Sequence, residues 1–279
     1  MGDVNNYTGG PSHGETGGML GDCGALTMAD TWLRGVRDFD VERAYEVARR
    51  SAFTAATSRR DSLDPYMTLR YVPVEAGGSS ASKTMEYAYA DGAVANWARG
   101  IGRADDARAL TERSAAYRNL WDPAQGFLVG RSRDGAFSQL RSHTGWQDFY
   151  AEGGAWQYLW YAPHDLADRG TLLGGSTTFS RGSRCFTTSR WRRGTPLPDL
   201  LLARQRARHP HARGSSAGDF AGARASRYID WVRSTRYARR AETASGRHDA
   251  GTVSAWCLFS ALEIVSHHGL STNCWPPSR

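Results

Sequence analysis

Residues 150–165 read Tyr-Ala-Glu-Gly-Gly-Ala-Trp-Gln-Tyr-Leu-Trp-Tyr-Ala-Pro-His-Asp. A helix that begins near Gly154 would place Trp156 and Trp160 four residues apart, on one face. Glu152 would then lie beside the N–H groups at the start of that helix, which have no partner within it. Indole rings offer rigid apolar faces to a sugar, and apolar surroundings favour the protonated form of a carboxyl group. The pattern fits a sugar site with one acid, or alternatively a core helix that follows a solvent-facing glutamate.

The same residues resemble the Thr-Glu-Gly-Asn-Ala-Trp-Gln-Tyr-x-Trp signature of family 92 glycoside hydrolases, the calcium-dependent exo-acting α-mannosidases. Ala151 stands in place of the Thr and Gly154 in place of the Asn, and the other residues match. The resemblance implies that Glu152 is the general acid. It also implies that Trp156 and His164 belong to the sugar pocket or to its supporting shell.

Two acidic residues near the N-terminus extend this resemblance. Asp22 and Asp30 fall on the acidic positions of the family pattern Gly-Asp-His…Ala-Asp-x-Tyr-x-Lys-Gly-x-x-Asp-Phe-Asp, with Cys23 in place of the His. The resemblance places both in the sugar pocket or its supporting shell. A helix cap or a surface charge is the alternative for each.

Apolar periodicity predicts an all-α fold. Helices are expected over residues 40–57, 82–100, 105–120 and 251–264, another is expected around 26–33, and a short hairpin is expected over 122–131. Ser82 is the predicted N-cap of the helix over 82–100, and Asp38 or Asp40 is the predicted N-cap of the helix over 40–57. Paired helices with short connections indicate helical hairpins. The resemblance implies that they form part of an (α/α)6 toroid, which this chain would contain incompletely.

The expected organisation has four parts. These are a loop-rich lead (1–18), a fragment of the (α/α)6 catalytic domain (19–179), an Arg- and Ser-rich tract of low order (180–225) and C-terminal helices of the same domain (226–279). The family's large N-terminal β-sandwich has no counterpart in the sequence. We therefore expect the chain to represent part of the catalytic domain alone.

The net charge of +7 comes from arginine, since the chain holds 34 Arg and one lysine, Lys83. Nucleic-acid binders usually combine both cations on one face, so codon bias in a GC-rich gene explains this composition more simply. No apolar run approaches the ~20 residues of a membrane span. The N-terminus lacks the features of a signal peptide; an extracellular location would follow from the resemblance if the start of the chain is truncated.

Residues 181–213 contain nine Arg and one acidic residue. Such a tract could bind nucleic acid through phosphates, or it could be a disordered insert. We favour a third interpretation, in which a pair of compensating frameshifts altered the translation over residues 180–248. Family-like residues stop near residue 179 and resume near residue 249, as this interpretation requires.

Hydrolysis with inversion needs a second carboxylate that activates a water molecule. The resemblance implies that Asp249 is this base, in a region where the family reads Gly-Asn-Asp-Asp. Arg247 and His248 replace the Asn and the first Asp. Histidine lacks the negative charge of the replaced acid, and Arg247 would lower the basicity of Asp249. A helix cap is the alternative role for Asp249.

The resemblance also implies a calcium ion, whose ligands are oxygen atoms. Part of the family's calcium motif should fall between residues 180 and 225, where His209-Pro-His211 is a faint echo. The amide oxygen of Gln157 is the one candidate metal ligand nearby. The expected activity is removal of non-reducing α-linked mannose from an α-mannoside glycan, impaired in this chain. A non-catalytic sugar-binding remnant and a basic nucleic-acid module are the alternatives.

Overall fold

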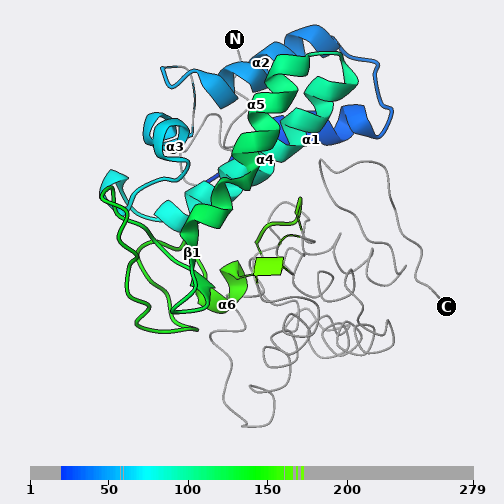
Figure 1. Cartoon of the computed structure of the whole chain (residues 1–279). Helices are drawn as coiled ribbons and strands as arrows, with labels where there is room; N and C mark the ends of the chain where they lie inside the picture. Colours follow the sequence, from blue (N-terminus) through cyan, green and yellow to red (C-terminus); the bar gives the residue numbers. More distant parts are fainter. Residues whose placement is uncertain are drawn as a thin grey trace, which may run out of the picture. The chain divides into compact units, whose positions relative to one another are not determined.

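The computed structural model describes residues 20–56, 58, 60–159, 161–165, 168 and 171–172, and Figure 1 shows the order of their elements. Their contacts group them into two units. Among the described residues, the first unit holds residues 20–141 and 147–151, and the second holds residues 142–146 and those from 152 onward. The C-terminal parts of the expected organisation, including the predicted helix over 251–264 and the tract of low order, lie outside the described residues.

The first unit is built almost entirely from helices. In chain order its elements are α1 (Cys23–Leu33), α2 (Val41–Phe53), α3 (Leu63–Leu69), the 3₁₀ helix η1 (Val74–Ala76), α4 (Ser80–Gly100), α5 (Ala104–Ser114), the 3₁₀ helix η2 (Ala115–Leu120), β1 (Trp121–Asp122) and β2 (Phe127–Leu128). The two strands form an antiparallel pair, which confirms the predicted hairpin.

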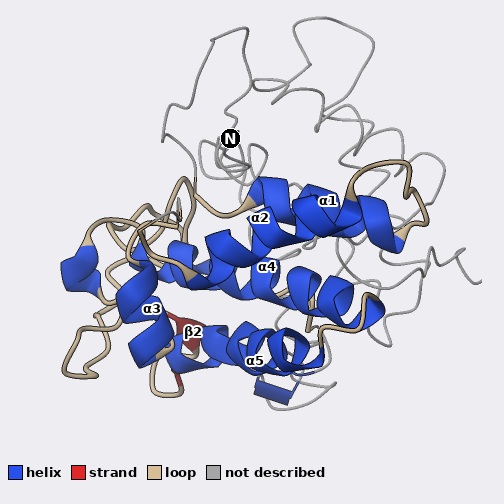
Figure 2. Cartoon of the chain, turned by 90° about the horizontal axis from the view of Figure 1, so that it is seen from above, coloured by secondary structure: helices blue, strands red, loops and turns tan. Residues whose placement is uncertain are grey.

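Helix α4 lies at the centre of the first unit, with α1 and α2 on one side of it and α5 on the other (Figure 2). Sixteen of its 21 residues are buried, so the helix has no broad polar face. Alanine is frequent along it, and short side chains let neighbouring helices approach closely. At Gly100 the approach is close, because a Cβ atom there would lie 2.2 Å from the indole ring of Trp32 on α1.

A hydrophobic core joins α1, α2, α4 and α5. The ring of Tyr45 meets that of Trp97 edge to face, with centroids 5.3 Å apart, an arrangement that aromatic pairs favour. The buried members of this core are Ala25, Ala29, Trp32, Tyr45, Ala48, Ala52, Ala93, Val94, Ala95, Trp97, Ala98, Ala107 and Leu110. The amphipathic stripes of α2 and α5 therefore face one apolar layer, as their periodicity predicts.

Several predicted helix limits differ from those observed. Helix α2 ends at Phe53, with Thr54 extended as its C-cap, rather than continuing to residue 57. The predicted helix over 105–120 changes from α to 3₁₀ geometry after Ser114. Ser82 is not the N-cap of α4, because the helix begins at Ser80 and its first N–H groups bind carbonyls from residues 148 and 149. Asp40 does cap α2, since its carboxylate accepts the N–H of Arg43 at 3.0 Å.

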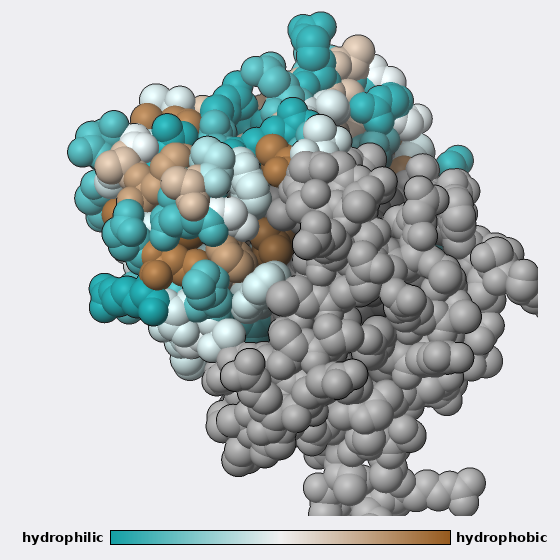
Figure 3. Space-filling model, turned by 60° about the horizontal axis from the view of Figure 1, so that its bottom comes forward, coloured by the Kyte–Doolittle hydropathy of each residue, from teal (hydrophilic) through white to brown (hydrophobic). Residues whose placement is uncertain are grey.

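The second unit contains one described helix, α6 (Ala155–Tyr158). No helix in the described part of the chain is both long and apolar enough to span a membrane. Figure 3 shows one face of the molecule, where hydrophilic residues cover much of the coloured surface and apolar patches lie between them.

Candidate functional site

Glu152 lies on a strained turn directly before α6. Its φ angle is +48°, in the left-handed region that residues other than glycine seldom adopt. The side chain is half-buried. A backbone of this kind costs on the order of 1–3 kcal/mol and persists only where surrounding contacts impose it. Residues on either side must therefore hold the backbone of this glutamate in place.

Helix α6 is a single turn that Gln157 closes onto Gly154. The amide oxygen of Gln157 accepts the N–H of Gly154, while the carbonyl of Gly154 accepts the N–H groups of Gln157 at 3.0 Å and Tyr158 at 3.2 Å. Because Gln157 is buried, these bonds are shielded from water and fix the backbone two residues after Glu152. The predicted helix start at Gly154 is confirmed.

Residues 142–146 pack against the start of α6. The carbonyl of His143 accepts the N–H of Trp156 at 3.2 Å. A Cβ atom on residue 154 would lie 2.8 Å from the carbonyl oxygen of Thr144, closer than real Cβ contacts. Glycine, which replaces the family's Asn at this position, therefore permits the close approach of this segment.

Two other candidates, Trp156 and His164, belong to the second unit. Trp156 is half-buried on the helix, and His164 is half-buried in the turn at residues 163–164. Trp160 and Asp249 lie outside the described residues, so the predicted pairing of Trp156 with Trp160 and the distance from Glu152 to Asp249 stay predictions.

Asp22 and Asp30 lie at the two ends of α1, in the first unit. Asp22 is the N-cap residue, and its Oδ1 accepts the N–H of Ala25 at 3.4 Å. Its carboxylate is fully buried and also accepts hydrogen bonds from Ser51 Oγ and Arg60 Nε, both at 2.9 Å. Asp30 forms an ion pair with Arg34 at 2.8 Å, and 14% of its side chain is exposed. Of the two, Asp30 keeps some access to solvent, whereas the contacts of Asp22 are internal.

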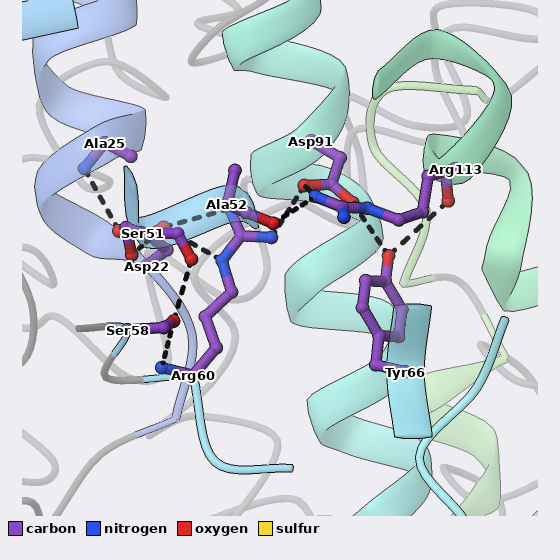
Figure 4. Close-up of polar contacts among 9 residues, drawn as sticks. All are labelled: Asp22, Ala25, Ser51, Ala52, Ser58, Arg60, Tyr66, Asp91 and Arg113. Atoms are coloured by element: carbon purple, nitrogen blue, oxygen red, sulfur yellow. Dashed lines mark hydrogen bonds and ion pairs between the residues drawn. The ribbon is translucent and has the colours of Figure 1, made fainter. Parts of the chain in front are cut away.

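Asp22 belongs to a buried ion-pair network that joins the helices of the first unit (Figure 4). Arg60 links it to Asp91 on α4, with 2.6 Å between Arg60 Nη1 and Asp91 Oδ1. Asp91 also accepts Arg113 Nε at 2.6 Å and Arg113 Nη2 at 2.8 Å. Tyr66 on α3 donates its hydroxyl to Asp91 Oδ2 at 2.9 Å. Two carboxylates and two guanidinium groups balance to zero net charge inside the core.

Asp91 and Arg60 remain ionised despite burial. Burial alone would raise the pKa of Asp91, but Arg113 and then Arg60 outweigh it and hold that pKa below its ordinary value. Burial alone would lower the pKa of Arg60, yet Asp91 and Asp22 raise it. Burial, followed by the charge of Asp91, raises the pKa of Tyr66, so its hydroxyl remains protonated and donates.

Sequence reasoning did not identify the role of Arg60, Asp91 or Arg113. One signal was available, because Asp91 interrupts a run of small and aromatic residues between Tyr87 and Ala95. An acid at such a position is buried and requires a cationic partner. The identity of that partner was not readable, since Arg60 and Arg113 lie 31 and 22 residues away in the chain.

A calcium ion takes six to eight oxygen ligands, most often with carboxylates among them. The described residues contain no group of three or more His, Cys, Asp or Glu side chains arranged to hold a metal. The amide oxygen of Gln157 accepts a backbone N–H, and alone it does not make a calcium site. The ligands expected between residues 180 and 225 lie outside the described residues, so the calcium site stays a prediction.

Residues 8–192 match the glycosyl hydrolase family 92 catalytic domain. An uncharacterized secreted glycosidase of Arthroderma benhamiae is 25% identical over 193 residues, which make up 55% of this chain and 24% of that protein. A family 92 α-mannosidase from Bacteroides thetaiotaomicron superposes with a TM-score of 0.71 at 28% identity, over 88% of this chain and 32% of its own. A family 92 inverting mannosidase from the same bacterium superposes with a TM-score of 0.73 at 25% identity, over 91% of this chain and 37% of its own.

These likenesses confirm the predicted all-α fold, an incomplete (α/α)6 toroid of helical hairpins. The chain spans about a quarter to a third of the length of the proteins that it matches.

Proposed function

Because the chain belongs to glycoside hydrolase family 92, we propose that it is part of an inverting α-mannosidase that removes non-reducing α-linked mannose. The observation that supports this most directly is the backbone at Glu152. A left-handed glutamate, followed by a glycine-capped turn that carries Trp156, is local strain of the kind that functional sites retain.

Glu152 would act as the general acid and donate its proton to the glycosidic oxygen as the bond to the anomeric carbon breaks. Asp249 would accept a proton from a water molecule that attacks this carbon from the opposite face, which inverts its configuration. The two carboxyl groups of inverting glycosidases lie roughly 6.5–9.5 Å apart, which leaves room for this water. The half-buried indole of Trp156 would pack against the mannose ring.

Turnover should be weak in the chain as it stands. Arg247 and His248 occupy the positions of an amide and an acid in the family's base motif, and a neighbouring cation lowers the basicity of a carboxylate. A sugar-binding protein without turnover is therefore the second candidate function. Calcium is expected through family membership alone, and its role is part of this proposal.

Hydrolysis of 4-nitrophenyl α-mannoside, with and without added calcium, tests the proposal. The full chain should release nitrophenol slowly, and proton NMR should detect β-mannose as the first product. Glu152→Gln should abolish hydrolysis of an α-mannoside with a poor leaving group, which needs the acid. Saturable binding of mannose without turnover would support the second candidate. If the chain neither binds mannose nor hydrolyses the mannoside, both candidate functions are refuted.

A further inference from the structure

The first turn of α4 binds the backbone that leads into Glu152. The N–H of Ser79 donates to the carbonyl of Asp148 at 2.6 Å, and the N–H groups of Ala81 and Ser82 both donate to the carbonyl of Phe149, at 3.0 and 3.3 Å. The N–H groups at a helix start have no partner within the helix and need acceptors from elsewhere. Here residues nearly 70 positions later in the chain supply them, so the start of α4 and residues 148–149 hold each other.

Ser82 adds a bond in the opposite direction. Its hydroxyl oxygen accepts the N–H of Ala151 at 2.9 Å. Ser82 is fully buried and Ala151 is half-buried, so an N–H that loses its acceptor at this place is unfavourable. The bond uses the backbone of residue 151, which explains how Ala can stand where the family has Thr: its side chain does not make this contact.

Ala151 is bonded directly to Glu152, whose φ angle of +48° requires an external constraint. We propose that Ser82 is a positioning residue for the general acid. Its hydroxyl fixes the peptide group between Tyr150 and Ala151, one peptide group before the one that joins Ala151 to Glu152, while the capped turn at Gly154 fixes the backbone that follows. This inference rests on the proposed function for the role of Glu152, but the constraint on the backbone can be measured without it.

Ser82→Ala removes the acceptor, and Ser80→Ala is the matched control. Ser80 lies in the same turn of α4 and is equally buried, and its hydroxyl oxygen makes no hydrogen bond with any described residue. Both changes delete one buried oxygen from the same helix. Their difference isolates the bond to Ala151 from a general effect on packing.

Amide hydrogen exchange in the full chain is the first measurement. Peptides that cover residues 148–156 should exchange about tenfold faster in Ser82→Ala than in the wild type, whereas Ser80→Ala should leave them unchanged. Ser82→Cys keeps the shape of the side chain but is a weaker acceptor, so its exchange rate should lie between those of the wild type and Ser82→Ala. It takes the place of Ser82→Ala if that variant unfolds. Unchanged protection in the Ser82 variants would overturn the proposal whether or not the chain is active.

Leaving-group dependence is the second measurement. The 2,4-dinitrophenolate of an activated α-mannoside leaves without being protonated, whereas hydrolysis of an α-mannoside with a poor leaving group needs the acid. Ser82→Ala should lower kcat for the substrate with the poor leaving group about tenfold and should change kcat for the activated substrate by no more than about twofold. Ser82→Thr, which keeps a hydroxyl group, should retain kcat for the substrate with the poor leaving group. Equal losses on both substrates would show a structural role only and contradict positioning. If the wild type hydrolyses neither substrate, the proposed function fails while hydrogen exchange still decides the constraint.

Discussion

Asp91→Asn should destabilise the chain strongly, because Asp91 is the centre of the buried network. Its carboxylate accepts four hydrogen bonds, of which three come from the guanidinium groups of Arg60 and Arg113 and one comes from Tyr66. Asparagine has nearly the same shape but presents an NH₂ group to one of these donors and removes the charge. Two buried cations would then share the single carboxylate of Asp22.

Breaking a buried ion pair by removing one partner costs about 3–5 kcal/mol. Whole domains are stable by ~5–15 kcal/mol, so this one change should remove a large part of the total. With about 2–4 °C of melting temperature for each kcal/mol in a chain of this size class, the transition should fall by roughly 6–20 °C. Urea and thermal unfolding of the full chain, followed by circular dichroism, measure both quantities.

Asp105→Asn is the matched control, because it makes the same chemical change in an exposed ion pair. Asp105 lies 2.8 Å from Arg108, with 90% of its side chain exposed, and exposed pairs contribute about 0–1 kcal/mol. A loss below about 1 kcal/mol in Asp91→Asn, or equal losses in the two variants, would refute the assignment of this network as a principal tertiary contact.

Three further perturbations follow from single contacts. Because the pKa of Asp91 is lowered, the stabilisation from its charge is present above the ordinary carboxyl pKa and is lost as the pH falls below about 4. Asp91→Asn should therefore flatten the curve of unfolding free energy against pH in that range, and an unchanged slope would contradict this prediction. Gly100→Ala should lower the urea midpoint by an equivalent of about 1–3 kcal/mol, since its Cβ would meet the Trp32 ring at 2.2 Å; a gain in stability, as helix propensity alone predicts, would show that the ring can move. Gly154→Asn, which restores the family residue, should accelerate hydrogen exchange in residues 142–146 because its Cβ would meet the carbonyl of Thr144 at 2.8 Å, and undisturbed protection would show that the segment accommodates it.

Local patterns predicted α1, α2, α4 and α5 but not α3, and they predicted the turn at the start of α6. The stripe of α2 and its cap at Asp40 were predicted from sequence and are observed, because both depend on residues within four positions of each other. The motif from Glu152 to Trp156 carries its own turn chemistry, with Gly154 as the start of α6. These features follow from short-range sterics and hydrogen bonding.

The predicted role of Ser82 as a helix cap was wrong for a reason that local sequence cannot supply. A serine three residues before a run of apolar residues is typical of an N-cap. In the structure, carbonyls from residues 148 and 149 take over the capping, the helix begins earlier, and the hydroxyl of Ser82 becomes available for Ala151. The outcome depended on a segment that reaches α4 only after the chain has folded back.

The sequence by itself determined that the chain is helical, that it resembles family 92 glycosidases, and that Glu152 is the candidate acid, because periodicity and a contiguous motif are encoded within short distances along the chain. Only the tertiary structure decided that Asp22 is enclosed by Arg60 and Ser51, that Asp91 joins α3, α4 and α5, and that Ser82 holds the N–H of Ala151. Those pairings join residues 22 to 69 positions apart. No periodic pattern specifies the partner of a buried polar group, because it is selected by which helix faces pack together.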